Sequence, residues 1–402
     1  MSLAVAVKNN LKRLVGQPSL AKWSLKDTVS IFVYHEVSDH PSRFCEQHLL
    51  NMPPKFFTEH IRFITDHFHV ISPDQLLSGQ YDTPAALITF DDGMPGYFRQ
   101  AVPIMAKFKV PSILFINMAP VRGELFWSGL ITYLTDSDKN FVRFLHQQKG
   151  QHDGIPDFLL CDPHIVDDYL ATIKDKEEIF RQVRAFYGEF ATMDDVSAMK
   201  NEPLVFFGNH FYNHYNAARL SDEQLRDQYL LNQARIDALP QGRPFFAYPF
   251  GQPGMCFSSY QTKLLQSWGA KAVFSSSGRI NTRNTTGFYD RIGVDIQIQT
   301  IEDLMGRIQC GRIKHMLKGT QPKNPSYVQS LKLWYCRLWL YGGNPACGDR
   351  TASPGFETHR HLRCQRGGSQ SDSWVSHVCP SGRPFFAAPR YRFCLHPQLF
   401  FS

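Results

Sequence analysis

The sequence predicts an α/β fold built on a parallel β-sheet. Short runs rich in β-branched and aromatic residues alternate with segments in which apolar residues recur at helical spacing. Such alternation is typical of strand–helix–strand units with right-handed crossovers. With 402 residues, 43% of them hydrophobic, the chain can bury a large core. The composition therefore excludes a fully disordered chain, whereas the pattern alone leaves open whether the sheet is open or closed into a barrel.

The predicted elements follow one another in chain order. Strands are expected at 29–35, 86–92, 112–118, 204–207, 245–248, 271–275 and 289–294. Helices are expected at 56–68, 97–108, 221–239, 260–268 and 301–309. Ser221, with Gln224 three residues later, fits a capping box at the start of one helix. The charged, helix-rich stretch from about 120 to 202 breaks this rhythm, so we expect it to be a helical insertion on one face.

Residues 321–402 differ in composition from the rest of the chain. They hold ten Lys or Arg against three Asp or Glu, which accounts for the whole net charge of +7. They also hold five of the nine Cys and eight Pro, but no Ile or Met. We expect this basic, irregular tail to be disordered or translated in a non-native frame. Its His/Cys cluster could bind zinc, but the spacing matches no ordinary zinc finger: His359, His361, Cys364, His377 and Cys379.

The remaining composition bears on domains and location. Residues 1–320 carry no net charge and four scattered Cys, which suits a reducing compartment. The first 17 residues are too polar for a signal-peptide core, and the uncharged run 244–262 contains Pro and Gly that would break a spanning helix. We therefore expect a cytoplasmic protein of bacterial type with no membrane span and no nucleic-acid partner. The expected divisions are 1–28, 29–320 and 321–402.

Two adjacent carboxylates, Asp91 and Asp92, end the predicted strand 86–92. Active sites of α/β folds lie at the carboxyl ends of their strands. Adjacent carboxylates repel, so the pKa of one rises unless a cation is present. A metal on one Asp would leave the other ionised and able to act as a base. The alternative interpretation is a cap for a helix that starts near residue 94.

Two histidines, His210 and His214, follow the predicted strand 204–207. Imidazoles at positions i and i+4 can face one cation, and the preceding strand places this pair at the same end of the sheet as Asp92. Two His and one Asp leave coordination positions open for water or substrate. His35 ends the first strand, where a lone His is often structural. A sharp turn follows the strand 245–248, and its alternative interpretation is an ordinary turn.

Taken in order, the motifs TFDDG, GNHFYNH and YPFG resemble those of the NodB-type polysaccharide deacetylases, carbohydrate esterase family 4. The resemblance covers about residues 29–310. It implies a distorted (β/α)7 barrel and a divalent metal, usually zinc, held by Asp92, His210 and His214, with Asp91 as general base. The Tyr34-His35 strand resembles a branch of the family whose members begin with a YHxV strand. In that branch the first-strand histidine, which corresponds to His35, is the general acid.

The sequence departs from the family pattern at two positions. Phe211 stands where Ser or Thr is usual, and Ala247 stands where an Arg usually orients the base. We expect Arg291, from a later strand, to substitute for that Arg. No convincing LxxH motif appears near the end of the barrel, and this absence is harmless if His35 is the acid. We expect the turn residues to contact the substrate, with a backbone N–H of the turn, that of Phe250, as an oxyanion donor: Tyr248, Pro249 and Phe250.

The resemblance implies hydrolysis of an N-acetyl group on a sugar polymer or glycan intermediate. Asp91 would remove a proton from water, and His35 would protonate the departing amine. The insertion at 120–202 is expected to shape the substrate groove. Two other functions stay open: a non-catalytic glycan-binding protein on the same fold, and an esterase acting on O-acetyl groups.

Overall fold

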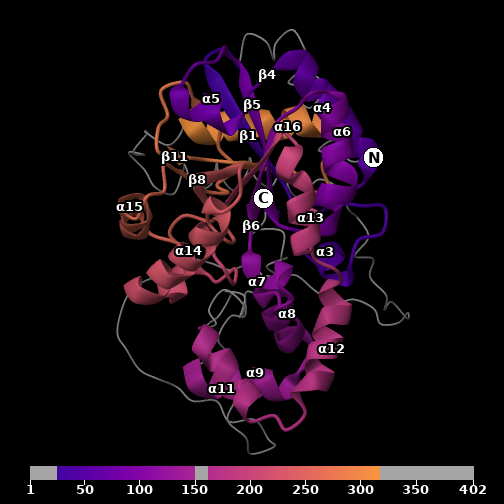
Figure 1. Cartoon of the computed structure of the whole chain (residues 1–402), viewed down its shortest axis with the longest axis vertical. Coiled ribbons are helices and arrows are strands. Elements are labelled where there is room, and N and C mark those ends of the chain that lie inside the picture. Colours follow the sequence, from indigo (N-terminus) through magenta and orange to yellow (C-terminus); the bar gives the residue numbers. More distant parts are fainter. Residues whose placement is uncertain (1–24, 150–161, 317–402) are drawn as a thin grey trace, which may run out of the picture. The chain divides into compact units, whose positions relative to one another are not determined.

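A computed structural model describes residues 25–149 and 162–316 of the chain (Figure 1). Predictions for the basic tail, its His/Cys cluster and most of the N-terminal segment lie outside the described residues. A ten-stranded sheet forms the centre of the described part, in the order β10-β1-β5-β6-β7-β8-β9-β11 with β4 and β12 attached. Neighbouring strands in the run from β1 to β11 are all parallel, as the alternating pattern predicts.

Seven strand positions nearly close the sheet into a barrel. The first six are β1 (Thr28–Tyr34), β5 (Ala85–Asp92), β6 (Ser112–Ile116), β7 (Val205–Asn209), β8 (Gly242–Ala247) and β9 (Ala272–Phe274). At one edge β9 pairs with β11 (Phe288–Tyr289), and at the other β1 pairs with β12 (Ile292–Gly293). Because β11 and β12 are consecutive, this segment joins the two edges. The predicted distorted (β/α)7 barrel is confirmed, with its seventh strand broken in two.

The break corrects the prediction of one strand over 289–294. Asp290 and Arg291 separate β11 from β12. The Asp290 carboxylate accepts hydrogen bonds of 2.6 Å from Ser275 and from Ser277, and Arg291 Nε donates to the Ser275 carbonyl at 3.1 Å. Side-chain hydrogen bonds thus hold the chain where the strand is interrupted, and these contacts are not visible in the local pattern.

Several other boundaries differ from prediction, and at two of them the kind of element changes as well. The helix expected over 97–108 begins with a π-turn at Tyr97–Ala101 and becomes α6 (Val102–Lys107). Pro103 has no N–H, so a regular α-helical ladder cannot run through this point. The strand expected over 112–118 ends at Ile116, and the short helix α7 (Met118–Val121) follows.

Alternate residues of the strands pack into two separate hydrophobic cores. One set faces the barrel interior and includes Val29, Leu87, Phe115 and Phe274. The other set includes Phe32, Ile88 and Leu114 and packs with α4 (Pro54–His67), α6 and α16 (Ile301–Met316). Both faces of the sheet are therefore buried, which explains why the strands read as continuous apolar runs. Two short outer strands complete the sheet: β4 (His69–Val70) beside β5, and the antiparallel β10 (Asn281–Thr282) beside β1.

The helical insertion lies between β6 and β7. Its longer helices are α8 (Trp127–Ser137), α9 (Lys139–Lys149), α11 (Pro163–Ala171) and α12 (Lys176–Tyr187), followed by α13 (Met193–Ala198). In Figure 1 the first four group together. They share a separate apolar core to which α3 (Arg43–Gln47) contributes Phe44, whose ring lies 5.9 Å from that of Phe186. The sequence pattern did not reveal α3 or the two-stranded sheet of β2 (Glu36–Val37) and β3 (Asn51–Met52).

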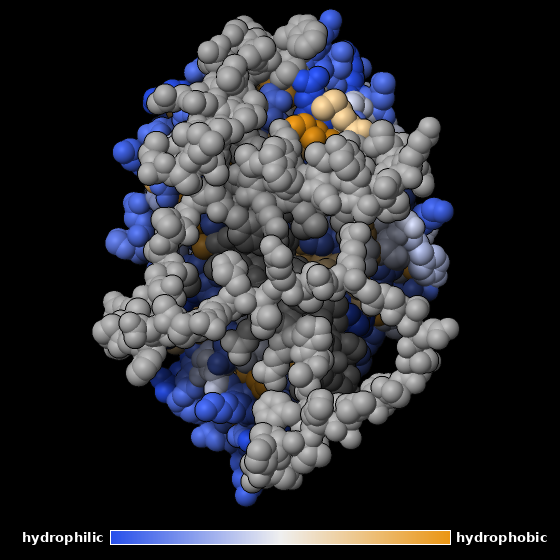
Figure 2. Space-filling model, turned by 180° about the vertical axis from the view of Figure 1, so that it is seen from behind, coloured by the Kyte–Doolittle hydropathy of each residue, from blue (hydrophilic) through white to orange (hydrophobic). Residues whose placement is uncertain are grey.

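The remaining helices cover the outside of the barrel. α14 (Asp222–Asp237) begins at Ser221 with the predicted capping box to Gln224, and α15 (Ser259–Ser267) and α5 (Pro73–Ser78) begin with boxes of the same kind. In the view of Figure 2, the described residues that reach the surface are mostly hydrophilic, and hydrophobic ones show only in small areas. No helix among the described residues is both long and apolar enough to cross a membrane.

Candidate active site

A cavity lies at the carboxyl ends of the parallel strands. It encloses about 570 Å³, including the space at its open mouth. Residues at or just beyond the ends of β1, β5, β7, β8 and β9 line it, so one feature of the topology brings together side chains that are distant in sequence. The wall also includes residues of α3 and α8 and of the segments that flank them: Phe44, His48, Leu50, Phe126, Ser128 and Thr132.

Asp92, His210 and His214 form a buried cluster in this cavity. Asp92 Oδ1 lies 3.5 Å from His210 Nε2 and 3.1 Å from His214 Nε2. One possible ligand atom of each residue lies within 4.8 Å of the other two. The structure thus brings together the three residues predicted to hold a metal.

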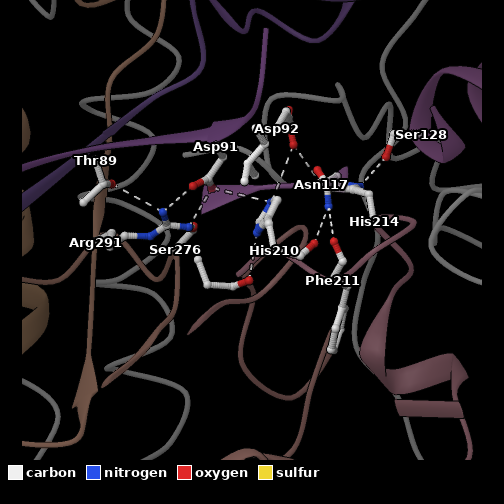
Figure 3. A network of polar contacts seen from close by, with 12 residues as sticks. Thr89, Asp91, Asp92, Asn117, Ser128, His210, Phe211, His214, Ser276 and Arg291 are labelled. Carbon is white, nitrogen blue, oxygen red and sulfur yellow. Dashed lines mark hydrogen bonds and ion pairs between the residues drawn. The ribbon is translucent and has the colours of Figure 1, made fainter. Parts of the chain in front are cut away.

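Each histidine of the cluster is held through its other ring nitrogen. His210 Nδ1 donates to the carbonyl of Ala247, at the end of β8, over 2.8 Å. His214 Nδ1 lies 2.6 Å from the hydroxyl of Ser128, on α8. Partners of this kind fix the ring orientation and leave Nε2 available to a cation. Figure 3 shows both imidazoles turned toward Asp92.

The cluster depends on unusual backbone conformations. Asp92, Phe211 and His214 have positive φ angles of 75°, 58° and 61°, which L-residues seldom adopt. Although the i, i+4 spacing suits a helix, the two histidines lie in a loop. Asn117 Nδ2 donates to the carbonyls of His210 and Phe211 and so helps to hold that loop. Strained residues that surrounding contacts stabilise are common at functional sites.

Phe211, one of the departures from the family pattern, has a packing role. Its side chain is fully buried, and its ring lies 4.7 Å from that of Phe246. Its backbone N–H donates to Asn209 Oδ1 at 2.9 Å. Asn117 and Asn209 thus form hydrogen bonds with the loop, while Phe211 fills an apolar cluster against β8.

Asp91 lies beside the cluster and is bound by Arg291. The guanidinium donates from Nη1 to Asp91 Oδ1 at 2.6 Å and from Nη2 to Oδ2 at 2.7 Å. Arg291 also donates to Thr89, Ser275 and Ser276, so each of its nitrogens has an acceptor. Both side chains are almost completely buried. Figure 3 shows Arg291 on one side of Asp91 and His210 on the other.

Comparison with known proteins identifies the family of a large segment of the chain. Residues 78–273 match the sequence model of the polysaccharide deacetylases, and this segment includes Asp91, Asp92, His210 and His214. The segment belongs to the polysaccharide deacetylase family. A search of curated proteins finds no match to the chain.

Several solved structures of low sequence identity are similar to this chain. Streptococcus pyogenes deacetylase PplD, in complex with acetate, is 16% identical; the match covers 70% of this chain and 98% of PplD, with a TM-score of 0.46. IcaB from Ammonifex degensii is 18% identical over 67% of this chain and 93% of its own, with a TM-score of 0.43. The de-N-acetylase from Aggregatibacter actinomycetemcomitans is 16% identical over 67% and 95%, also with a TM-score of 0.43.

At Asp91 and Asp92, burial and the neighbouring charges shift the pKa in opposite directions. Burial alone would raise the pKa of Asp91, but Arg291 and His210 outweigh it and the pKa lies below its usual value. The pKa of Asp92 is lowered further, because His214 and His210 outweigh the effect of burial. Both carboxylates are therefore ionised at neutral pH. Burial lowers the pKa of His214, and the negative charge of Asp92 offsets this effect only in part.

His35 lines the cavity at the end of β1, one residue beyond the paired Tyr34 and Phe90, and so beside Asp91. It is half-buried. Burial lowers its pKa, and the charges of Asp92 and Asp91 only partly offset this effect.

The three predicted turn residues occupy different environments. Tyr248 borders the cavity, but its ring stacks on Phe257 at 3.8 Å and its hydroxyl lies 3.1 Å from that of Thr262, so its side chain belongs to the core. Pro249 is buried and is not among the cavity residues. Phe250 is half-buried, lines the cavity and places its ring 4.9 Å from that of His214. Of the two that line the cavity, Phe250 is the more exposed.

The sequence pattern did not reveal the residues that the insertion adds to the cavity. Ser128 and Thr132 face it from α8, and Phe126 precedes that helix. His48, whose Nε2 lies 3.2 Å from the Thr132 hydroxyl, comes from the first crossover. Each lies in a segment whose spacing carries no metal or catalytic motif, so only the packing of the insertion identifies them.

Proposed function

We propose that this protein is a metal-dependent hydrolase that removes N-acetyl groups from a carbohydrate. One observation carries the proposal: a buried Asp–His–His cluster and a separate arginine-bound carboxylate converge on one cavity in a polysaccharide deacetylase domain. The Asp–His–His cluster suits a bound cation, and the arginine-bound carboxylate suits a general base.

The donor set fits a divalent cation such as zinc. It offers two imidazole nitrogens and one carboxylate oxygen, a combination with coordination positions left over for water and substrate. Asp92 Oδ1 is buried and forms no hydrogen bond of acceptable geometry with the described residues. A bound cation would satisfy this oxygen. Held by Asp92, His210 and His214, it would supply Lewis-acid activation of water and of the acetyl carbonyl.

Asp91 is the proposed general base. Its lowered pKa keeps it ionised, and a carboxylate has lone pairs left after accepting two hydrogen bonds from Arg291. It can therefore take a proton from an attacking water. Arg291 is the proposed positioning residue, because its two-pronged contact fixes the plane of the carboxylate.

His35 is the proposed general acid. It shares the cavity with Asp91, and it would donate a proton to the amine nitrogen as the C–N bond breaks. Phe250 is the proposed sugar contact, since a half-buried aromatic ring at the cavity wall can stack on the apolar face of a sugar. We also propose that its backbone N–H donates to the oxyanion.

Metal content and acetate release together test this function. Purified full-length protein should contain about one zinc-like ion per chain, and an Asp92→Ala/His210→Ala variant should contain none. The wild type should release acetate from N-acetylated sugars. Asp91→Asn should keep the metal but lose about 10²–10⁴-fold in kcat. A variant that kept most of its rate would show that Asp91 is not the base.

Two outcomes would replace the proposal. Release of acetate from O-acetyl sugars alone would show an esterase. A folded protein that binds glycan but turns over neither substrate would show a non-catalytic member of the fold.

A further inference from the structure

The two histidines of the cluster differ in what holds them. His210 depends on a backbone carbonyl of the barrel, which any residue at 247 would supply. His214 depends on a side chain, the hydroxyl of Ser128, which is 5% exposed and lies 2.6 Å from His214 Nδ1. Ser128 belongs to α8, in the helical insertion, and not to the barrel. Figure 3 shows it reaching His214 from that helix.

The start of α8 is fixed against the loop that carries His214. The ring of Phe126 lies 5.4 Å from that of His214, and the ring of Trp127 lies 4.9 Å from that of Tyr215. Phe126, Trp127 and Ser128 are consecutive, and all three are buried. The insertion and the histidine loop therefore meet through three neighbouring side chains.

The side of α8 that faces α12 is also tightly packed. A Cβ atom added to Gly129 would lie 2.4 Å from Cδ1 of Tyr187, at the end of α12. Such a distance allows no side chain without a shift of the helix or of Tyr187. The helix is thus held between α12 and the histidine loop, and Ser128 cannot move away from His214 freely.

We propose that Ser128 is a positioning residue for His214, and that the insertion thereby sets the metal affinity of the barrel. The inference rests on the proposed function only in that the cluster binds a divalent cation. A hydroxyl can both donate and accept. It can donate to Nδ1 while Nε2 carries the hydrogen toward Asp92, and it can accept from Nδ1–H when Nε2 faces a cation. Alanine would leave His214 Nδ1 buried with neither option.

The test is the zinc affinity of the full-length protein after the metal has been stripped with a chelator. Ser128→Ala should weaken zinc binding about 10- to 100-fold, the range found when outer-shell partners of metal ligands are removed. Ser128→Val is a second loss variant, and it differs from Ser128→Thr only in lacking the hydroxyl. Ser128→Thr, which keeps the hydroxyl, should bind within a few-fold of wild type.

Thr132→Val is the matched control for zinc affinity. It removes another buried hydroxyl from the same helix, but one that faces His48 and not His214. It should leave zinc affinity within a few-fold of wild type. The visible spectrum of the cobalt-substituted protein gives a second readout, because a reoriented imidazole should change it in Ser128→Ala and not in Thr132→Val.

The outcomes separate the two proposals. Equal zinc affinity of Ser128→Ala and wild type, or equal losses in Ser128→Ala and Thr132→Val, would overturn the role of Ser128 while leaving the proposed function intact. A wild-type chain that binds no zinc and no other divalent cation would overturn both.

Discussion

Replacing Arg291 with methionine would remove the guanidinium that binds Asp91, with little change in side-chain length. The side chain of Arg291 is 0% exposed and that of Asp91 is 5% exposed, so water cannot take the place of the guanidinium. Removing one partner of a buried ion pair typically costs about 3–5 kcal/mol, because the other charge is left uncompensated. We expect Arg291→Met to lower the free energy of unfolding by this amount at pH 7.

The pH dependence has a definite sign. In the wild type the pKa of Asp91 is lowered, so its stabilising effect is present above the unfolded pKa and is lost as pH falls through the folded pKa. Without Arg291, burial is the largest remaining effect and would raise this pKa. The difference in stability between variant and wild type should therefore be largest near neutral pH and shrink as pH falls toward the unfolded pKa of about 3.9.

Urea unfolding of the chelator-treated protein at several pH values measures this difference, and kcat at neutral pH measures the effect on the base. Arg243→Met is the matched control. Arg243 also binds a carboxylate, Asp74, through two hydrogen bonds of 2.7 and 2.9 Å, but the Asp74 side chain is 55% exposed. Such a pair contributes about 0–1 kcal/mol. If Arg291→Met were as stable as Arg243→Met and turned over at wild-type rate, Asp91 would not depend on Arg291.

Three other predictions concern Glu36, Gly96 and Phe250. Burial raises the pKa of Glu36 to about 7, so the stability of Glu36→Gln relative to the wild type should rise by about 3 kcal/mol between pH 4.5 and 7 in urea unfolding. A Cβ at Gly96 would lie 1.7 Å from Glu36 Oε1 and 2.4 Å from the Val37 carbonyl, so Gly96→Ala should unfold at clearly lower urea; an unchanged midpoint would contradict this contact. Phe250→Ala should raise KM for an N-acetylated oligosaccharide more than it lowers kcat, whereas a pure kcat effect would exclude sugar stacking.

The fold could be predicted from the sequence because the strands are buried on both faces. A run such as VSIFVY, at 29–34, supplies one core with Val29 and Ile31 and the other with Phe32, so it is apolar apart from Ser30. Short paired strands could not be predicted, because they are too short to show a sequence pattern. β2 and β3 have two residues each, and so short a segment has no period to detect.

The candidate site was predictable only where a residue follows a strand. Asp92 and His210 stand at or next to the ends of β5 and β7, so parallel pairing brings them together without further information. Ser128 lies within a helical insertion, and its approach to His214 depends on how α8 packs against α12. No spacing rule connects residues 128 and 214, and their contact is a property of the tertiary structure alone.

We propose that Arg291 takes the place of the Arg that the family pattern has at position 247. Ala247 and Arg291 come from β8 and from the break before β12, yet Ala247 packs with Phe115 in the barrel interior and the Arg291 guanidinium lies 5.3 Å from the same ring. Both positions therefore border one enclosed space. An Ala247→Arg substitution should add a second buried cation there and destabilise the protein, and adding Arg291→Ala should recover part of that loss. A double-mutant cycle by urea unfolding measures the coupling, and strictly additive effects would show that the two side chains do not share this space.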